Sequence, residues 1–314
     1  MSAEPRPTPG RDTLRSLIER LFVERGAHRP RAAWRLLAHG ALALSLMTCL
    51  SIPLILVPGA LQPGPVSMEV LGLSSVGGAI GITLATVIAR RWLDRRSFRS
   101  LGLQFDRSAA ADLAVGFLIP AAQMGLVFLL EVALGWSRWE GWAWEAEPPA
   151  LVLGGLGLSL GTFVLVGWQE ELLSRGYHLQ NLIEAAGLPW AIGISSAIFA
   201  LLHLGNPGAG LASTLGLVAA GLFLAYAYLR TGRLWLSIGL HVGWNFFEGT
   251  VFGFPVSGLD LFRLMRHTVD GPGWATGGGF GPEAGAVMLP AYALGLLLVR
   301  LYTARPRPDS LLTR

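Results

Sequence analysis

The sequence predicts an all-α membrane protein, a polytopic helix bundle with about eight transmembrane helices. Hydrophobic residues make up 52% of the 314 residues and charged residues only 14%, against about a quarter in an ordinary soluble protein. The mean hydropathy is +0.52. The apolar residues also gather in runs of about 20 residues, the length that a helix needs to cross a bilayer. This composition excludes a soluble globular enzyme and an intrinsically disordered chain.

Residues 1–35 are expected to form an arginine-rich cytoplasmic arm. This segment carries eight Arg, from Arg6 to Arg35. Apolar residues recur at helical spacing between Leu14 and Phe22, with arginines on the other faces. That pattern is typical of an amphipathic helix on an anionic membrane surface, and a solvated arm fits it equally well. The charged region is too long for a cleavable signal peptide.

The membrane domain is expected over residues 36–303, and residues 304–314 follow it as a cytoplasmic tail. Eight apolar segments of the domain are long enough to span a bilayer. In chain order they are 37–58, 69–90, 110–135, 151–173, 189–205, 211–230, 233–252 and 284–302. The fifth and seventh segments carry polar residues and fit least well. We find no internal repeat and no separate soluble domain.

The charges of the connecting segments predict the orientation of the chain. Connection 90–107 holds six Arg and two Asp, whereas connection 136–149 holds three Glu, one Arg and four Trp. Arginine-rich loops stay in the cytoplasm, and Trp gathers at membrane interfaces. We therefore expect an integral membrane protein with both termini in the cytoplasm and the Gly/Pro-rich connection 253–282 outside. All 24 basic residues are Arg, a coding bias that suggests a prokaryotic cell membrane.

Two further features argue against a nucleic-acid partner and against disulfides or a cysteine metal cluster. The net charge is +4, but the arginines lie at the ends of the apolar runs. This placement fits membrane topology, and we expect the lipid bilayer and no nucleic acid as a partner. Cys49 is the single cysteine and lies in an apolar run, which excludes a disulfide framework and a cysteine metal cluster.

Ionisable residues inside membrane spans are costly and therefore mark functional candidates. Here they concentrate in the fourth, fifth and seventh segments: Glu170, Glu171, Arg175, His203, His241 and Asn245. If the fourth helix continues to about Ala186 and the chain turns at Gly187, Glu170 lies about 24 Å and His203 about 21 Å from that turn. An antiparallel helix pair then brings both to one depth, and the seventh segment enters from the same side.

Such a cluster has the chemistry for hydrolysis. Arg175 lies one helical turn after Glu171 and can neutralise it, whereas Glu170 points about 100° away and is desolvated. A desolvated carboxylate suits general-base activation of a water, and His203 can hold that water and later protonate a leaving amine. His241 and Asn245 offer donors for an oxyanion.

The same residues leave a metal alternative open. Glu170, His203 and His241 with a water also match a zinc ligand set with one open position. The sequence contains no HExxH motif, however, so the usual geometry of such zinc peptidases is absent. We favour the metal-free mechanism, which requires no cofactor, over zinc.

The three segments, in this order, resemble the CPBP family of intramembrane proteases, also described as metalloproteases. The family includes the type II CAAX prenyl endopeptidases and the bacterial Abi and lysostaphin-resistance-like proteins. Its pattern is EExxxR, then FxxxH, then HxxxN or HxxxD on successive late helices. In this chain the pattern reads Glu170-Glu171-xxx-Arg175, Phe199-xxx-His203 and His241-xxx-Asn245, within a motif core of residues 150–252.

The resemblance implies an eight-helix endopeptidase that cleaves a membrane-embedded or lipid-anchored peptide near the cytoplasmic leaflet. By position, it implies that Glu170 and His203 activate the water and that His241 and Asn245 form the oxyanion site. Ser174 departs from the family, which often has an aromatic residue before the Arg. This departure concerns packing or the shape of the substrate.

Other functions fit parts of the same pattern. A non-catalytic scaffold, such as a bacteriocin-immunity or maturation protein, would keep the fold without turnover. A proton-coupled transporter would use Glu170 and His203 as a relay, but the sequence has no half-to-half repeat and no paired broken helices. We expect Glu131 and Glu248 to be structural and Gly154-Gly155 to allow close helix packing. No role is assigned to His28, His39, His178 or His267.

Overall fold

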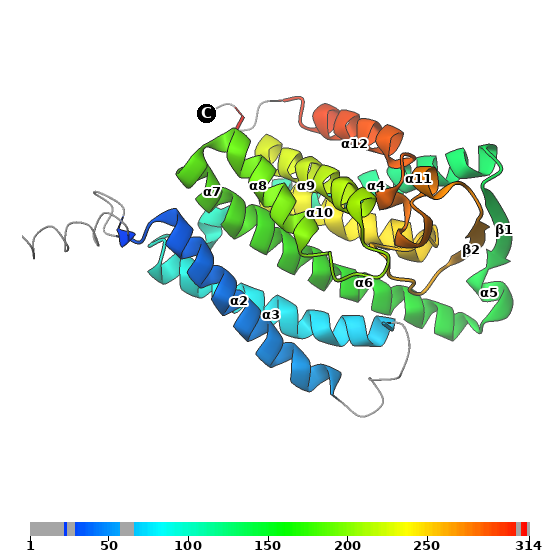
Figure 1. Ribbon diagram of the computed structural model, residues 1–314, viewed down its shortest axis with the longest axis horizontal. Helices are drawn as coiled ribbons and strands as arrows, with labels where there is room; N and C mark the ends of the chain where they lie inside the picture. The colour runs from blue at the N-terminus through cyan, green and yellow to red at the C-terminus, as the bar shows by residue number, and fades with distance from the viewer. Residues whose placement is uncertain (1–21, 24–28, 57–65, 306–308, 313–314) are drawn as a thin grey trace, which may run out of the picture.

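The computed structural model describes residues 22–23, 29–56, 66–305 and 309–312, and these form a bundle of helices (Figure 1). The all-α prediction is therefore confirmed. The expected amphipathic helix between Leu14 and Phe22 lies outside the described residues, apart from Phe22 itself. The ring of Phe22 stacks on Trp34, with 4.6 Å between the ring centroids.

The helices follow the apolar segments of the sequence. They are α2 (Ala32–Ile55), α3 (Met68–Trp92), α4 (Arg107–Ala133), α6 (Pro149–Glu171), α7 (Leu179–Ala186), α8 (Leu188–Leu201), α9 (Leu211–Thr231), α10 (Leu234–Asn245) and α12 (Met288–Tyr302). By length and composition, five described helices can cross a membrane: α2, α3, α4, the helix Pro149–Ala186 and α9. The helices α8 and α12 are apolar but shorter. The number eight therefore stays a prediction.

The helix that carries the first motif is unusually long. It runs from Pro149 to Ala186 as α6, the π-helical segment η2 (Leu172–His178) and α7. It ends at Gly187, which has a φ of 79°, a conformation that glycine adopts at little cost. Pro189 then lies in the first turn of α8, where its missing N–H is no loss. The expected continuation to Ala186 and the turn at Gly187 are confirmed.

Two connections that we expected to be loops each contain a short strand, and these two strands pair with each other. Strand β1 (Ser137–Trp142) pairs antiparallel with β2 (Met265–Val269), and the register shifts between Trp139 and Gly141. Short helices flank the pair: α5 (Ala143–Ala146), α11 (Gly273–Thr276) and the 3-10 segments η4 (Gly278–Phe280) and η5 (Pro282–Ala284). A further 3-10 segment, η1 (Phe98–Leu101), follows α3. The connections 136–149 and 253–282 thus form one cap at one end of the bundle (Figure 1).

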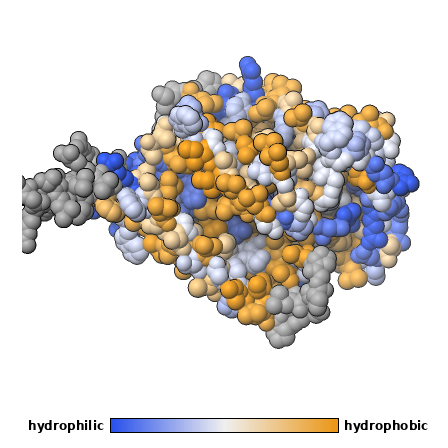
Figure 2. All heavy atoms as spheres, in the orientation of Figure 1, coloured by the Kyte–Doolittle hydropathy of each residue, from blue (hydrophilic) through white to orange (hydrophobic). Residues whose placement is uncertain are grey.

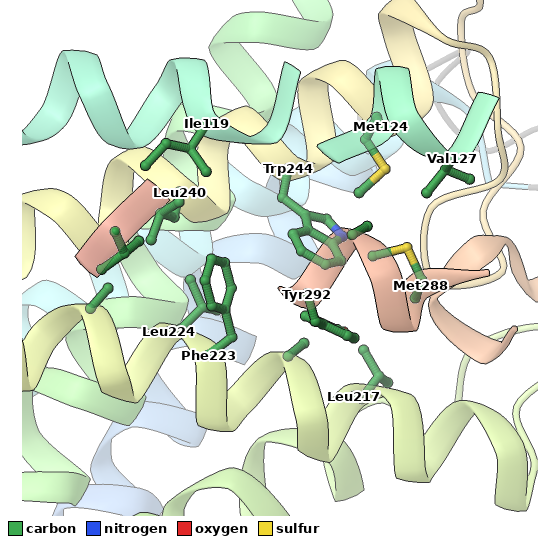
Figure 3. Close-up of a cluster of buried hydrophobic side chains, with 14 of the residues drawn as sticks. Ile119, Met124, Val127, Leu217, Phe223, Leu224, Leu240, Trp244, Met288 and Tyr292 are labelled. Atoms are coloured by element: carbon green, nitrogen blue, oxygen red, sulfur yellow. The ribbon is translucent and has the colours of Figure 1, made fainter. Parts of the chain in front are cut away.

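Helix α10 lies in the middle of the molecule, and glycines allow it to approach α4. A Cβ atom at Gly243 would lie 2.2 Å from the carbonyl oxygen of Phe117, and one at Gly239 would lie 2.4 Å from that of Leu113. On its other side α10 contributes Trp244 to the hydrophobic core, where the indole stacks on Tyr292 with 5.4 Å between centroids (Figure 3). Close packing through small residues is typical of membrane helices.

The glycine pair Gly154-Gly155 of α6 does not pack against a neighbouring helix as we expected. A Cβ atom at Gly155 would lie 2.7 Å from the ring of Phe262, which belongs to a loop and not to a helix. At Gly154 a Cβ atom would meet nothing within 4 Å. The prediction that both residues allow close helix packing is therefore wrong for Gly154.

The surface of the bundle suits a lipid environment. Figure 2 shows hydrophobic residues across the middle of the visible face, with hydrophilic residues gathered at the end that carries β1 and β2. Large apolar side chains are exposed on several helices, for example Leu37 on α2, Leu129 on α4 and Leu153 on α6, each more than 60% exposed. Apolar surface of this extent is rare on soluble monomers, and the chain is an integral membrane protein.

Candidate active site

The fold brings the three motifs together at one cavity. Glu170 lies at the end of α6, His203 just after α8, and His241 and Asn245 on α10. All four line a cavity of about 560 Å³. His203 lies beyond the last residue of α8, so the predicted segment 189–205 is longer than the helix. The helix ends before Gly205-Asn206-Pro207-Gly208, residues that favour turns.

Glu170 faces two imidazole rings. Its Oε2 atom lies 3.7 Å from Nε2 of His203 and 3.8 Å from Nε2 of His241. Both distances exceed a direct hydrogen bond, and Oε2 has no hydrogen-bond partner among the described residues. A gap of this size between polar atoms is where a bridging water fits.

Hydrogen bonds on the far side of each ring fix which nitrogen carries a proton. Nδ1 of His203 lies 2.9 Å from the carbonyl oxygen of Phe199, which can only accept. Nδ1 of His241 lies 2.8 Å from Oε1 of Glu171. Both Nδ1 atoms therefore donate, and both Nε2 atoms are directed towards Glu170. The tautomer of His203 with its hydrogen on Nδ1 presents the lone pair of Nε2 to the gap.

Glu171 and Arg175 lie behind the cavity wall. Glu171 is fully buried, and its Oε1 atom accepts hydrogen bonds from Nη1 of Arg175 and Nδ1 of His241, each at 2.8 Å. Its Oε2 atom accepts from the hydroxyl of Ser237. These bonds neutralise the carboxylate and orient the ring of His241. Burying a charge is costly unless it is paired and hydrogen-bonded, as it is here. We infer that Glu171 and Arg175 position His241 and do not contact the reacting atoms.

Arg175 also ties the neighbouring helices together. Its Nη2 atom donates to the carbonyl oxygen of Gly221 on α9 at 3.1 Å. Its guanidinium lies 4.5 Å from the centroid of the Phe199 ring on α8, a cation–π arrangement. Through Glu171 and Arg175, the first motif therefore links α8, α9 and α10.

Sequence reasoning gave no role to three members of this arrangement. Ser237 lies one helical turn before His241, so its spacing could have placed it on the same face of α10. Gly221 contributes only a carbonyl group, which has no sequence signal. Glu283 lines the same cavity from η5, and its position in a Gly/Pro-rich segment gives no hint of this. Ser174, the departure from the family pattern, also lines the cavity.

A metal site is not evident in the geometry. No group of three or more His, Cys, Asp or Glu side chains in the described part of the chain could hold a metal ion. The zinc set of Glu170, His203 and His241 therefore does not fit an ion as the side chains stand. We derive no step through a metal.

An apolar helix bundle with a half-buried carboxylate and two imidazoles around one cavity defines a class: membrane proteins with a polar site between their helices. Residues 152–247 match the family model described as type II CAAX prenyl endopeptidase Rce1-like. The match runs from α6 to just beyond α10 and contains all three motifs, so the family resemblance is confirmed for this part of the chain. No curated protein and no solved structure matches the chain.

Proposed function

We propose that the protein is an intramembrane endopeptidase that hydrolyses a peptide bond of a membrane-associated substrate. The single observation that carries this proposal is the position of Glu170. Its unpartnered Oε2 atom lies within 3.8 Å of two imidazole nitrogens at the wall of the cavity. A carboxylate in this setting is equipped to take a proton from water.

The first chemical step is attack by this water. The water donates one hydrogen bond to Oε2 of Glu170 and one to Nε2 of His203, which leaves a lone pair directed at the substrate carbonyl. As the new C–O bond forms, Glu170 takes a proton from the water and the carbonyl oxygen becomes negative. Holding the water in one place supplies much of the rate increase, because attack then needs no further ordering.

The negative oxygen needs donors, and α10 supplies them. The amide group of Asn245 lines the cavity one helical turn beyond His241. His241 lies between Glu170 and Glu171 and donates through Nε2 when its ring is charged. Preorganised donors of this kind stabilise the transition state more than the ground state.

The second step releases the products. The C–N bond breaks, and the proton that Glu170 took passes to the leaving amine through Nε2 of His203. The products are a carboxylic acid and an amine, and Glu170 returns to its charged form. Atoms and charges balance without a cofactor.

The substrate class follows from the family description and from the cavity. Apolar residues of α2 and α3, among them Met47, Ile52 and Leu71, line one part of the cavity, and the polar cluster lies at another. This arrangement suits a peptide with an apolar or lipid-modified segment. A prenylated CAAX-like peptide fits, and so does another peptide near the membrane.

The test is cleavage by the full chain purified in detergent, with a library of membrane peptides and mass spectrometry of the products. We expect Glu170→Gln to reduce cleavage by about 10² to 10⁴-fold, while the variant still accumulates in the membrane. Glu131→Gln is the matched control, because Glu131 is buried and does not line the cavity.

Two outcomes would contradict parts of this proposal. Full function in both Glu170→Gln and His203→Ala would favour the non-catalytic scaffold. One zinc ion per chain in elemental analysis, with activity lost on chelation, would replace the metal-free mechanism.

A further inference from the structure

A second carboxylate lines the cavity, and the mechanism above does not use it. Glu283 belongs to η5, far along the chain from the three motifs, and only 4% of the residue is exposed. Trp244 and Ser257 line the cavity beside it. His203 lines the same cavity, so Glu283 shares it with the proposed reacting centre.

Three donors hold the Glu283 carboxyl group in place. Its Oε1 atom accepts from the indole N–H of Trp244 at 3.0 Å. Its Oε2 atom accepts from the backbone N–H of Ser257 at 2.8 Å and from its hydroxyl at 2.6 Å. Burial raises the pKa of Glu283, whereas the bonds from Ser257 and the nearby His203 ring oppose that rise. A cation that approached the carboxyl group would favour its charged form further.

The cavity lacks a fixed cation for this carboxylate. Glu171 is neutralised by Arg175, but Glu283 forms no ion pair with an arginine among the described residues. No Arg is among the described residues that line the cavity, and the chain contains no Lys. The ionisable groups of the lining are Glu170, Glu283 and two imidazoles. A buried carboxylate without a cation is costly. Unlike Glu131 and Glu248, which are also buried, Glu283 lines the cavity, where a bound substrate can supply the missing cation.

We propose that Glu283 binds a positively charged side chain of the substrate close to the scissile bond. This inference rests on the proposed peptidase function and specifies its substrate class: a peptide with Arg or Lys beside the cleaved bond. The same charge distribution disfavours an acidic side chain at that position.

A purely structural role for Glu283 makes a different prediction. Asn206, three residues after His203, donates to the carbonyl oxygen of Ser257 at 2.9 Å. Glu283 therefore also connects the segment after α8 to α10 through Ser257 and Trp244. Loss of such a connection would reduce cleavage of every substrate by the same factor, whatever the charge of the substrate.

The experiment compares matched peptides on the wild-type protein in detergent. One position at a time near the cleaved bond carries Arg, its neutral analogue citrulline, or Glu, and kcat/KM is measured for each. At one position we expect Arg to exceed citrulline by about tenfold or more, as for a hydrogen bond to a charged group, and Glu to fall below both.

Glu283→Gln then tests the assignment to this residue. The variant should bring the ratio of Arg to citrulline cleavage to about one, whatever its overall activity. Glu248→Gln is the matched control, because Glu248 is a fully buried neighbour of Glu283 that does not line the cavity. That variant should keep the wild-type ratio.

The outcomes separate this inference from the proposed function. Glu170-dependent cleavage with equal rates for Arg and citrulline peptides would overturn the inference alone. An unchanged ratio in Glu283→Gln would overturn the assignment to Glu283. Absence of Glu170-dependent cleavage of any peptide would remove the peptidase function and this inference with it.

Discussion

Glu170 and Glu171 carry the same side chain one position apart, and the fold gives them opposite surroundings. Glu171 is fully buried and bonded to Arg175, His241 and Ser237. Glu170 lines the cavity, with one oxygen that has no partner among the described residues. The rotation of about 100° per helical residue is enough to separate the two roles. One carboxylate is fixed behind the cavity wall, and the other faces the cavity with this unpartnered oxygen.

Ser237→Ala tests the positioning role at this scale. The variant removes one donor from the buried carboxylate of Glu171, so we expect the free energy of unfolding to fall by about 1–3 kcal/mol. We also expect a lower kcat, because His241 loses part of its anchor. The measurement is thermal unfolding in detergent together with peptide cleavage.

Ser159→Ala is the control for that experiment. Ser159 is a fully buried serine of α6 whose hydroxyl has no partner among the described residues. Its removal should leave both measurements close to wild type. Equal losses in the two variants would contradict the role assigned to Ser237.

The residues of the site were predictable to different degrees. Arg175 was paired with Glu171 from their spacing of four, and the structure has that ion pair at 2.8 Å. Local helical geometry carries such information in the sequence. Glu283 could not be found in the same way, because its partners Trp244 and Ser257 lie 39 and 26 residues away. Contacts of that kind depend on how the chain folds back over the bundle.

At the scale of helices and strands, the position of α10 depends on glycines. Gly239 and Gly243 face α4, and the carbonyl groups of α4 occupy the space that a side chain would need. His241 lies between these two glycines in the chain, and Asn245 follows. The contact with α4 therefore sets the depth at which His241 and Asn245 meet the cavity.

Gly243→Ala should displace α10. The new Cβ atom would lie 2.2 Å from the Phe117 carbonyl oxygen, so we expect a destabilisation of about 1–3 kcal/mol and a loss of cleavage. Gly154→Ala is the control, because nothing lies within 4 Å of its Cβ position. Thermal unfolding should show the control at or slightly above wild type, since alanine favours helix. A stable and active Gly243→Ala would contradict the close contact.

His267 makes the strand pair sensitive to pH. Its Nε2–H donates to the carbonyl oxygen of Phe252 at 2.7 Å, so its Nδ1 accepts from the hydroxyl of Ser137 at 2.9 Å. Burial lowers the pKa of His267 below its ordinary value of about 6.5. The unfolded chain therefore binds a proton at a higher pH than the folded chain. The contribution of His267 to the free energy of unfolding is therefore fully present above about pH 6.5. It falls as the pH drops towards the pKa that His267 has in the folded protein.

The measurement is the midpoint of thermal unfolding between about pH 5 and pH 8 in detergent. His267→Gln should have a lower midpoint at pH 8 and a weaker dependence on pH below about 6.5. An equal pH dependence in the variant and the wild type would show that other groups are responsible.

At the scale of the whole molecule, hydropathy located the helices well but could not count the spans or find the strands. The long apolar helices stand out because each satisfies the length criterion alone. The strand pair joins residues about 130 positions apart, and the six residues of β1 include a glycine at the bulge, which weakens any strand pattern. Arg90 is one of the six arginines of connection 90–107 from which we predicted the orientation. It is also buried and forms a hydrogen bond with Asp94 at 2.8 Å.

Labelling from the two sides of the membrane tests the predicted orientation. In a background with Cys49→Ser, since Cys49 is exposed, Ser97→Cys should react with an impermeant reagent only from the cytoplasmic side. Ala146→Cys should react only from the opposite side. Both positions are exposed. Labelling of both variants from one side would overturn the orientation.

The shortness of α8 has a consequence for the lipid around it. Its 14 residues give a length of about 21 Å, whereas the hydrocarbon layer is about 30 Å thick. Leu201 and Leu202, at its end, are more than half exposed, so this end offers apolar surface beside His203. If α8 crosses the bilayer, the lipid accommodates so short a helix by becoming thinner around it. The headgroups and their hydration shell would then dip towards Glu170, and the water that the proposed hydrolysis consumes would reach the cavity without a pore.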